Sequence, residues 1–104
     1  MDGKKNIYIS KKENHSSYCT VKREGGFEKE LASGNTWRPL IQLTYNHADK
    51  EERLRFCYYK NDRFIPRPFE IKEKDLPEVF KGALEAEIFN KETINKIKEL
   101  FSNY

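Results

Sequence analysis

From Tyr18 onward, hydrophobic and polar residues alternate with a period of two through the middle of the chain. From Thr36 to Tyr45 the large apolar side chains occupy every second position, and the alternation returns from Glu52 to Tyr59. This pattern is typical of strands that turn one face toward a core. We therefore predict strands over residues 36–45 and 52–59, joined by the polar turn NHADK at residues 46–50. The expected core side of the first strand carries Trp37, Ile41, Leu43 and Tyr45, and the opposite side carries Arg38, Leu40, Gln42 and Thr44.

Glycine-containing segments divide the region before these strands. The run YCTVKRE ends at Gly25-Gly26, and FEKEL follows directly. Glycine adopts the positive φ angles that tight turns need, so this arrangement predicts a hairpin. The segment ASGN, residues 32–35, is predicted as the next turn.

A fourth main strand is predicted over residues 63–71, after a turn at KND. Pro66 and Pro68 each remove a backbone donor from this segment. Proline is tolerated mainly at sheet edges or at bulges, so we expect an edge strand or a bulged strand here.

The pattern changes to helical spacing near residue 75. Asp75 is a suitable N-cap, Pro77 stands in the first turn, and Glu78 completes a capping box. Asn90 is a suitable N-cap for a second helix. The two predicted helices carry apolar stripes, at Leu76, Val79, Phe80, Ala83, Leu84 and Ile88 in the first and at Ile94, Ile97, Leu100, Phe101 and Tyr104 in the second.

Strands followed by helices indicate an α+β fold. We predict a curved antiparallel sheet of about four to five strands, followed by one or two C-terminal helices packed on one face. The 104 residues fit one domain. Residues 1–16 are expected to form an N-terminal arm or an edge strand, and residues 17–104 a single α+β domain.

The charge and cysteine content narrow the classes of protein only partly. The net charge of +3 permits a polyanionic partner without requiring one. The chain shows no signal peptide and no segment of transmembrane length, so no membrane association is expected. Cys19 and Cys57 are too few for a disulfide framework, and free thiols in a cytoplasmic protein are the expectation.

Catalytic and metal-binding signatures are missing from the sequence. His15 and His47 fall in predicted loops, and there is no Gly-x-Ser-x-Gly, phosphate-loop or His-Glu-x-x-His motif. His15 and Cys19 have a tolerable spacing for a metal site, but His47 and Cys57 would lie across a hairpin and do not form a recognised zinc knuckle. Small buried or half-buried residues explain the two cysteines more simply. We therefore expect a protein that is not an enzyme and that has no catalytic residue, metal or cofactor.

Cations and aromatic rings are interleaved in the middle of the chain. Single-stranded nucleic acid is bound by such mixtures, because cations neutralise phosphates while rings stack on bases. The candidate binding residues are Tyr18, Lys22, Trp37, Arg38, Arg53, Arg55, Tyr59, Arg63 and Arg67. Two other interpretations remain open. The same pattern suits a solvated sheet face, and arginine and tyrosine are also common where an adaptor module contacts another protein.

One part of the chain resembles a known group of proteins. The segment RFIPRPFEIKEKDLPEVFKGALEA, Arg63 to Ala86, and to a lesser degree WRPLIQLTY, Trp37 to Tyr45, resemble the positive-cofactor-four transcriptional coactivators and the related Pur and Whirly proteins. The resemblance covers about Tyr18 to Ile88. It implies binding of single-stranded DNA on the curved sheet, dimerisation through helices, and a role in transcription regulation or DNA maintenance. RNA is an equally open choice of ligand.

The apolar stripes of the two helices also favour a dimer. One small sheet does not bury both stripes easily, and a self-complementary contact between helices would cover the surplus. We therefore expect a homodimer through the C-terminal helices. The alternative is that both helices of one chain lie side by side on the same sheet face.

Overall fold

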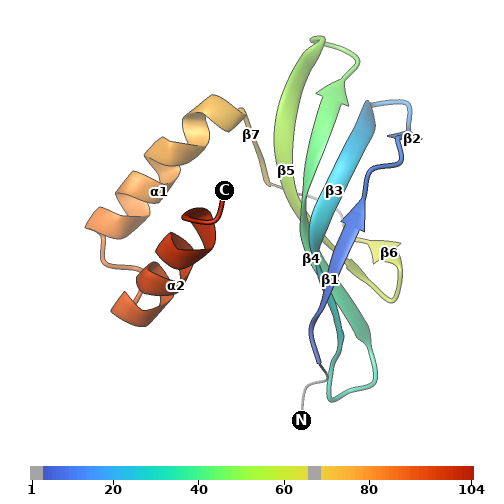
Figure 1. Cartoon of the computed structure of the whole chain (residues 1–104). Coiled ribbons are helices and arrows are strands. Elements are labelled where there is room, and N and C mark those ends of the chain that lie inside the picture. Colours follow the sequence, from blue (N-terminus) through green and yellow to red (C-terminus); the bar gives the residue numbers. More distant parts are fainter. Residues whose placement is uncertain (1–3, 66–68) are drawn as a thin grey trace. The chain divides into compact units, whose positions relative to one another are not determined.

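The computed structural model of the protein describes residues 4–65 and 69–104. The chain divides into two compact units, a sheet unit that ends at Glu73 and a helical unit over Lys74–Tyr104. The first contains every described strand, and the second contains two helices (Figure 1). The predicted α+β class is therefore confirmed. Packing of the helices on one face of the sheet stays a prediction.

The sheet unit is an open antiparallel sheet with three long central strands. β3, β4 and β5 are adjacent, while β1 and β2 both pair with β3, and β6 and β7 both pair with β5. Short strands therefore form both edges. The bounds are β1 Asn6–Ser10, β2 Asn14–His15, β3 Cys19–Glu30, β4 Thr36–Asn46, β5 Glu51–Lys60, β6 Arg63–Phe64 and β7 Phe69–Ile71. β6 and β7 occupy the predicted edge strand over residues 63–71, and Pro66 and Pro68 between them lie outside the described residues.

The central strands and their turns agree with the pattern of the sequence. β4 and β5 cover both predicted strands and pair without a register break. Residues 47–50 form the predicted turn between them. At the ASGN turn, Gly34 has a φ of 88° and its N–H donates to the carbonyl of Leu31 at 2.8 Å. These local predictions are confirmed.

The hairpin predicted at Gly25-Gly26 is wrong, because β3 runs through both glycines without turning. Neither glycine has a positive φ. A Cβ atom on Gly26 would lie 2.1 Å from the carbonyl oxygen of Pro39 and 2.7 Å from Cα of Leu40. Glycine is therefore needed here because the backbones of β3 and β4 approach each other closely. It does not serve a turn.

The sheet bends along its long strands (Figure 1), and its two faces differ in chemistry. We call one of them the inner face. Pairing and side-chain contacts place on it Tyr8, Ser10, Val21, Glu24, Arg38, Leu40, Gln42, Thr44, Arg53, Arg55, Cys57 and Tyr59. We call the opposite side, with Trp37, Ile41, Leu43 and Tyr45, the outer face. The inner face thus gathers most of the polar side chains of the central strands.

The assignment of the core side in β4 is corrected by the burial of its residues. Leu40, Gln42 and Thr44 of the inner face are 5%, 0% and 2% exposed. Ile41 of the outer face, which was expected in the core, is 43% exposed. Long neighbouring side chains cover the centre of the inner face, so an amide and a hydroxyl are buried there with hydrogen-bond partners.

The helical unit contains α1 Leu76–Glu85 and α2 Lys91–Phe101, and the 3₁₀ turn Glu73–Asp75 precedes α1. The predicted cap of α2 is confirmed, since the side-chain oxygen of Asn90 accepts from the N–H of Thr93 at 2.8 Å. The predicted capping box at Asp75 is wrong. Asp75 has helical φ and ψ angles and makes no side-chain capping bond, because the 3₁₀ turn already runs into the helix. Neither described helix is long and apolar enough to cross a membrane.

Candidate nucleic-acid interface

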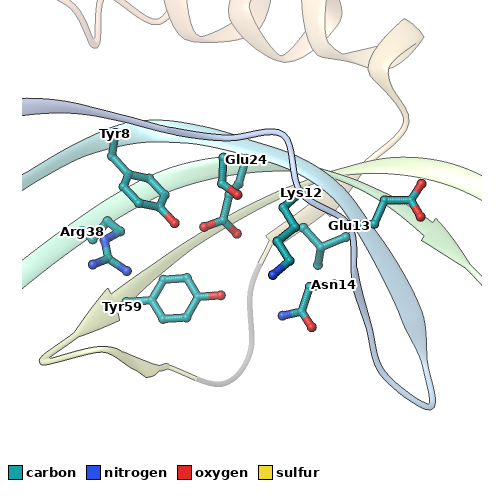
Figure 2. Close-up of a pocket in the computed structure, with 9 residues that line it drawn as sticks. Tyr8, Lys12, Glu13, Asn14, Glu24, Arg38 and Tyr59 are labelled. Atoms are coloured by element: carbon teal, nitrogen blue, oxygen red, sulfur yellow. The ribbon is translucent and has the colours of Figure 1, made fainter.

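Arg38 is the central cation of the inner face. Its Nη2 lies 2.8 Å from Glu28 and 2.9 Å from Asp62, so two carboxylates hold the guanidinium. Its Cζ lies 4.5 Å from the ring centre of Tyr8 and 5.6 Å from that of Tyr59. Figure 2 shows the guanidinium beside both rings. A cation and two aromatic rings are therefore joined in one cluster, and these contacts fix its geometry.

A pocket of about 350 Å³ opens next to this cluster. It lies where the edge strands β1 and β2 and the link between them meet the three long strands. Figure 2 shows the rings of Tyr8 and Tyr59 on one side, Lys12 and Asn14 on the other, and the carboxylate of Glu24 between them. The lining residues are Tyr8, Ser10, Lys12, Glu13, Asn14, Val21, Glu24, Arg38 and Tyr59. Its volume is at the low end for pockets that bind small ligands.

The two tyrosine hydroxyl groups at this pocket are weak acids. Burial raises the pKa of Tyr8, and a hydrogen bond with Glu24 and the charge of Glu24 raise it further. Burial followed by the charge of Glu24 raises the pKa of Tyr59. Both phenols therefore keep their protons at neutral pH and can act as hydrogen-bond donors.

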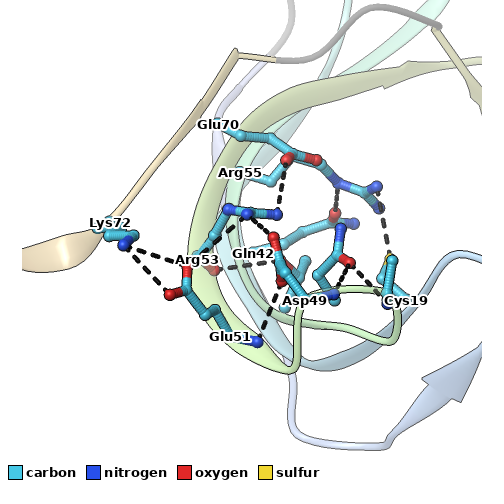
Figure 3. A network of polar contacts seen from close by, with 11 residues as sticks. Cys19, Gln42, Asp49, Glu51, Arg53, Arg55, Glu70 and Lys72 are labelled. Carbon is cyan, nitrogen blue, oxygen red and sulfur yellow. Dashed lines mark hydrogen bonds and ion pairs between the residues drawn. The ribbon is translucent and has the colours of Figure 1, made fainter.

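The fully buried Gln42 connects Glu24 with Arg55. Its Nε2 donates to Oε1 of Glu24 at 2.9 Å. Its Oε1 accepts from Nε of Arg55 at 2.7 Å, a contact drawn in Figure 3. The Arg55 guanidinium lies 3.7 Å from Sγ of Cys19 and 4.9 Å from the ring centre of Phe64. Within the described residues, Arg55 makes no ion pair with a carboxylate. It is the inner-face arginine whose charge is least neutralised.

Arg53 is enclosed by carboxylates at the other end of the inner face. It forms an ion pair with Asp49 and lies 3.8 Å from Glu51 and 3.9 Å from Glu70 (Figure 3). Lys72 also contacts Glu51, at 3.2 Å. A phosphate that approached Arg53 would have to compete with these carboxylates.

The structure brings together four of the nine predicted binding residues. Arg38, Arg53, Arg55 and Tyr59 all lie on the inner face. Arg38 pairs across the strands with Tyr59, and their contact joins a predicted cation to a predicted ring. Arg67 lies outside the described residues.

The other four predicted residues lie elsewhere. Trp37 belongs to the outer face, where it makes an edge-to-face contact with Phe27 at 5.5 Å. Lys22 stands at a register shift in β3 and contacts Glu52 and the ring of Tyr45 on the outer side. The shift breaks the strict alternation that, continued back from the rest of β3, would have placed Lys22 on the inner face, opposite Thr44. The other two are Tyr18, which precedes β3 and is 80% exposed, and Arg63, which pairs with Lys60 in β6 and points away from the Tyr59 side.

Seven of the nine lining residues were not predicted from the sequence, and Tyr8, Lys12, Asn14 and Glu24 are among them. A signal for Tyr8 exists, because it alternates with Ile7 and Ile9 in NIYIS and so must face the opposite side of the strand. Nothing local indicates that the polar link after β1 folds back over the inner face. That placement depends on the pairing of both β1 and β2 with β3.

The described residues show no obvious reactive centre. Burial raises the pKa of Cys57 to about 11, so its thiol is a weak nucleophile at neutral pH. His15 and His47 both contact the hydroxyl of Thr20, each at 2.9 Å. In the part of the chain that the structure describes, no three His, Cys, Asp or Glu residues are grouped in a way that could hold a metal ion.

Comparisons with known proteins identified no relative of this chain. No protein-family model matches the chain, and no curated protein or solved structure is significantly similar to it.

Proposed function

We propose that the protein binds single-stranded nucleic acid, DNA or RNA, on the inner face of its sheet. The observation that carries this proposal is the cluster in which the Arg38 guanidinium lies 4.5 Å from the Tyr8 ring and 5.6 Å from the Tyr59 ring, beside an open pocket. Unstacked bases bind to aromatic rings next to cations, and each stacked base contributes about 1–3 kcal/mol. A duplex would gain little, because its bases are already stacked.

The pairing of charges predicts how this binding depends on salt. Arg38 and Arg53 already have carboxylate partners, which leaves Arg55 as the least neutralised of the three arginines on the inner face. Each phosphate that is neutralised releases counterions and adds to the salt slope. We therefore propose that rings and base edges supply most of the affinity, and that the salt dependence is shallow for a nucleic-acid-binding protein.

The resemblance to positive-cofactor-four proteins extends this proposal to a role in transcription regulation or DNA maintenance. A cytoplasmic location belongs to the same proposal and agrees with two free thiols. The binding itself is tested by titrating the full chain into a fluorescent oligothymidine strand and measuring anisotropy at low and moderate salt. Saturable binding, displaced by unlabelled single strand and not by duplex, is expected. Failure to bind at low salt would overturn the proposal.

A homodimer through the helical unit completes the proposed assembly. No described residue of α1 or α2 is fully buried, although both helices are amphipathic. Leu100 and Phe101 are 55% and 64% exposed. Light scattering on the full chain should give the mass of a dimer, and replacing both residues with Glu should give the mass of a monomer. A monomeric wild-type protein would contradict this assembly.

A protein-interaction module is the second candidate function, and the outer face favours it. Ile7, Ile9 and Phe69 are 81%, 66% and 53% exposed on that side of the sheet. Apolar patches of this kind often mark contacts between proteins. If this candidate is correct, oligothymidine will not bind at low salt. The Ile9→Lys variant will then lose a protein partner that wild-type protein retains.

A further inference from the structure

The inner-face pocket has the lining expected of a site for one planar heterocycle. Its volume of about 350 Å³ accommodates a single base. Tyr8 and Tyr59 supply ring surface, while Glu24, Lys12 and Asn14 supply polar groups (Figure 2). Most of the lining is polar, and polar groups that converge on one space can fix the orientation of a ligand.

The Glu24 carboxylate has free capacity as an acceptor. A carboxylate offers about four acceptor positions. Gln42 occupies one of them through its Nε2 at 2.9 Å, and the Tyr8 hydroxyl occupies another. About two positions remain, and the carboxylate lines the pocket. A ligand with two adjacent N–H donors would satisfy both positions.

We infer that this pocket takes a guanine base of the bound strand, an inference that rests on the proposed function. Guanine presents its ring N1–H and its exocyclic amine side by side, and both can donate to Glu24. Adenine and cytosine place an acceptor nitrogen next to the amine, and thymine and uracil flank one N–H with two carbonyls, so each of these would bring an acceptor against the carboxylate. On the other side of the pocket, Lys12 and Asn14 can donate to O6 and N7 of guanine, which are acceptors.

The experiment compares three strands that differ at one position. The probes are a fluorescent oligothymidine strand, the same strand with one central guanine, and the same strand with hypoxanthine there. Hypoxanthine keeps the ring N–H and lacks the exocyclic amine. The guanine strand should bind wild-type protein at least about tenfold more tightly than oligothymidine, since hydrogen bonds to a charged group are the stronger kind. Hypoxanthine should lose most of that gain.

The matching variant is Glu24→Gln. Its side-chain carbonyl can still accept from Gln42, but its amide would oppose the guanine donors. The variant should bind guanine and thymine strands equally, so the ratio of the two affinities should fall from at least about tenfold to about one. Glu30→Gln on the exposed end of β3 is the control and should keep the preference. Thermal unfolding checks that both variants fold. If a variant does not fold, the comparison of the three strands on wild-type protein still tests the guanine site.

The outcomes separate this inference from the proposed function. Equal affinity of wild-type protein for all three strands, with oligothymidine binding intact, would overturn the guanine site alone. A guanine preference that survives Glu24→Gln would overturn the role of Glu24. Failure of every strand to bind at low salt would overturn both proposals.

Discussion

The side-chain oxygen of Gln42 accepts a hydrogen bond from Nε of Arg55 at 2.7 Å, and no part of Gln42 reaches solvent. The same amide donates to Glu24 at 2.9 Å. One buried amide thus fixes the position of a cation on one side and a carboxylate on the other. Buried polar networks of this kind stabilise a fold only while each member has its partner.

Replacing Gln42 with Leu should therefore destabilise the sheet unit. The substitution keeps a similar volume but leaves Glu24 and Arg55 without the amide, at a cost of about 1–3 kcal/mol in the free energy of unfolding. Urea unfolding followed by tryptophan fluorescence measures this change. Lys60→Ala, at the exposed end of β5, is the control and should change the free energy by less than about 0.5 kcal/mol. Equal stability of wild-type protein and the Gln42→Leu variant would show that the network contributes nothing.

The two glycines of β3 should respond differently to alanine. In Gly26→Ala the new Cβ would lie 2.1 Å from the carbonyl oxygen of Pro39, and rigid backbone cannot move away at low cost. We expect destabilisation of at least about 1–3 kcal/mol. In Gly25→Ala the nearest atom is the carbonyl oxygen of Tyr8 at 3.8 Å, an ordinary contact, so this variant should be neutral or slightly stabilised. Urea midpoints of the two variants measure the difference, and similar midpoints would contradict the close approach at Gly26.

These glycines also show where the sequence predicts the fold and where it does not. Alternation and turn residues located β4, β5 and the turn at Gly34 correctly, because those signals are local. A Gly-Gly pair, however, serves equally well a tight turn or a close contact between strands. Only the pairing of Gly26 with Leu40 decides between the two, and that contact joins residues distant in sequence.

The candidate site depends even more on distant contacts. Alternation placed Arg38, Arg53 and Arg55 on one side, and the structure agrees. Alternation could not predict that the inner face is the more buried one in β4. The bend of the sheet decides which face is enclosed. The partners that neutralise Arg53 come from a turn and from β7. No local pattern reveals them.

The two helix starts offer a matched test of capping. Asn90 accepts a hydrogen bond from the N–H of Thr93, whereas Asp75 makes no side-chain capping bond. Asn90→Ala should therefore cost about 1 kcal/mol, and Asp75→Ala should cost much less. Hydrogen exchange at the first amides of each helix measures the local effect. Faster exchange in α1 after Asp75→Ala would mean that Asp75 caps the helix in solution.

The Cys57 thiol makes the free energy of unfolding depend on pH in the alkaline range. Burial raises its pKa from 9.0 to about 11, so between these values the folded chain holds a proton that the unfolded chain has lost. Stability is then fully present below about pH 9 and falls as pH rises toward 11. In the Cys57→Ser variant, this loss of stability with rising pH should be smaller. The raised pKa values of Tyr8 and Tyr59 act in the same direction and leave a residual slope. Urea midpoints across this range, for wild type and variant, measure the contribution, and identical pH profiles would contradict it.

Two neighbouring tyrosines can distinguish the inner face from the outer face as the binding surface. Tyr59 lies beside Arg38 and the pocket, and Tyr58 points to the opposite side. Tyr59→Ala should weaken oligothymidine binding by about 1–3 kcal/mol, because a stacked base loses its ring. Tyr59→Phe should retain most of the affinity.

Tyr58→Ala is the control for this comparison, since it removes a ring of the same size from the same strand. It should leave the affinity for oligothymidine unchanged, with anisotropy as the measurement and circular dichroism as the check on folding. The reverse order, with Tyr58→Ala weakening binding and Tyr59→Ala leaving it intact, would move the nucleic acid to the outer face. The Arg38 cluster would then be a structural element that fixes β1 against β4 through its contact with Tyr8.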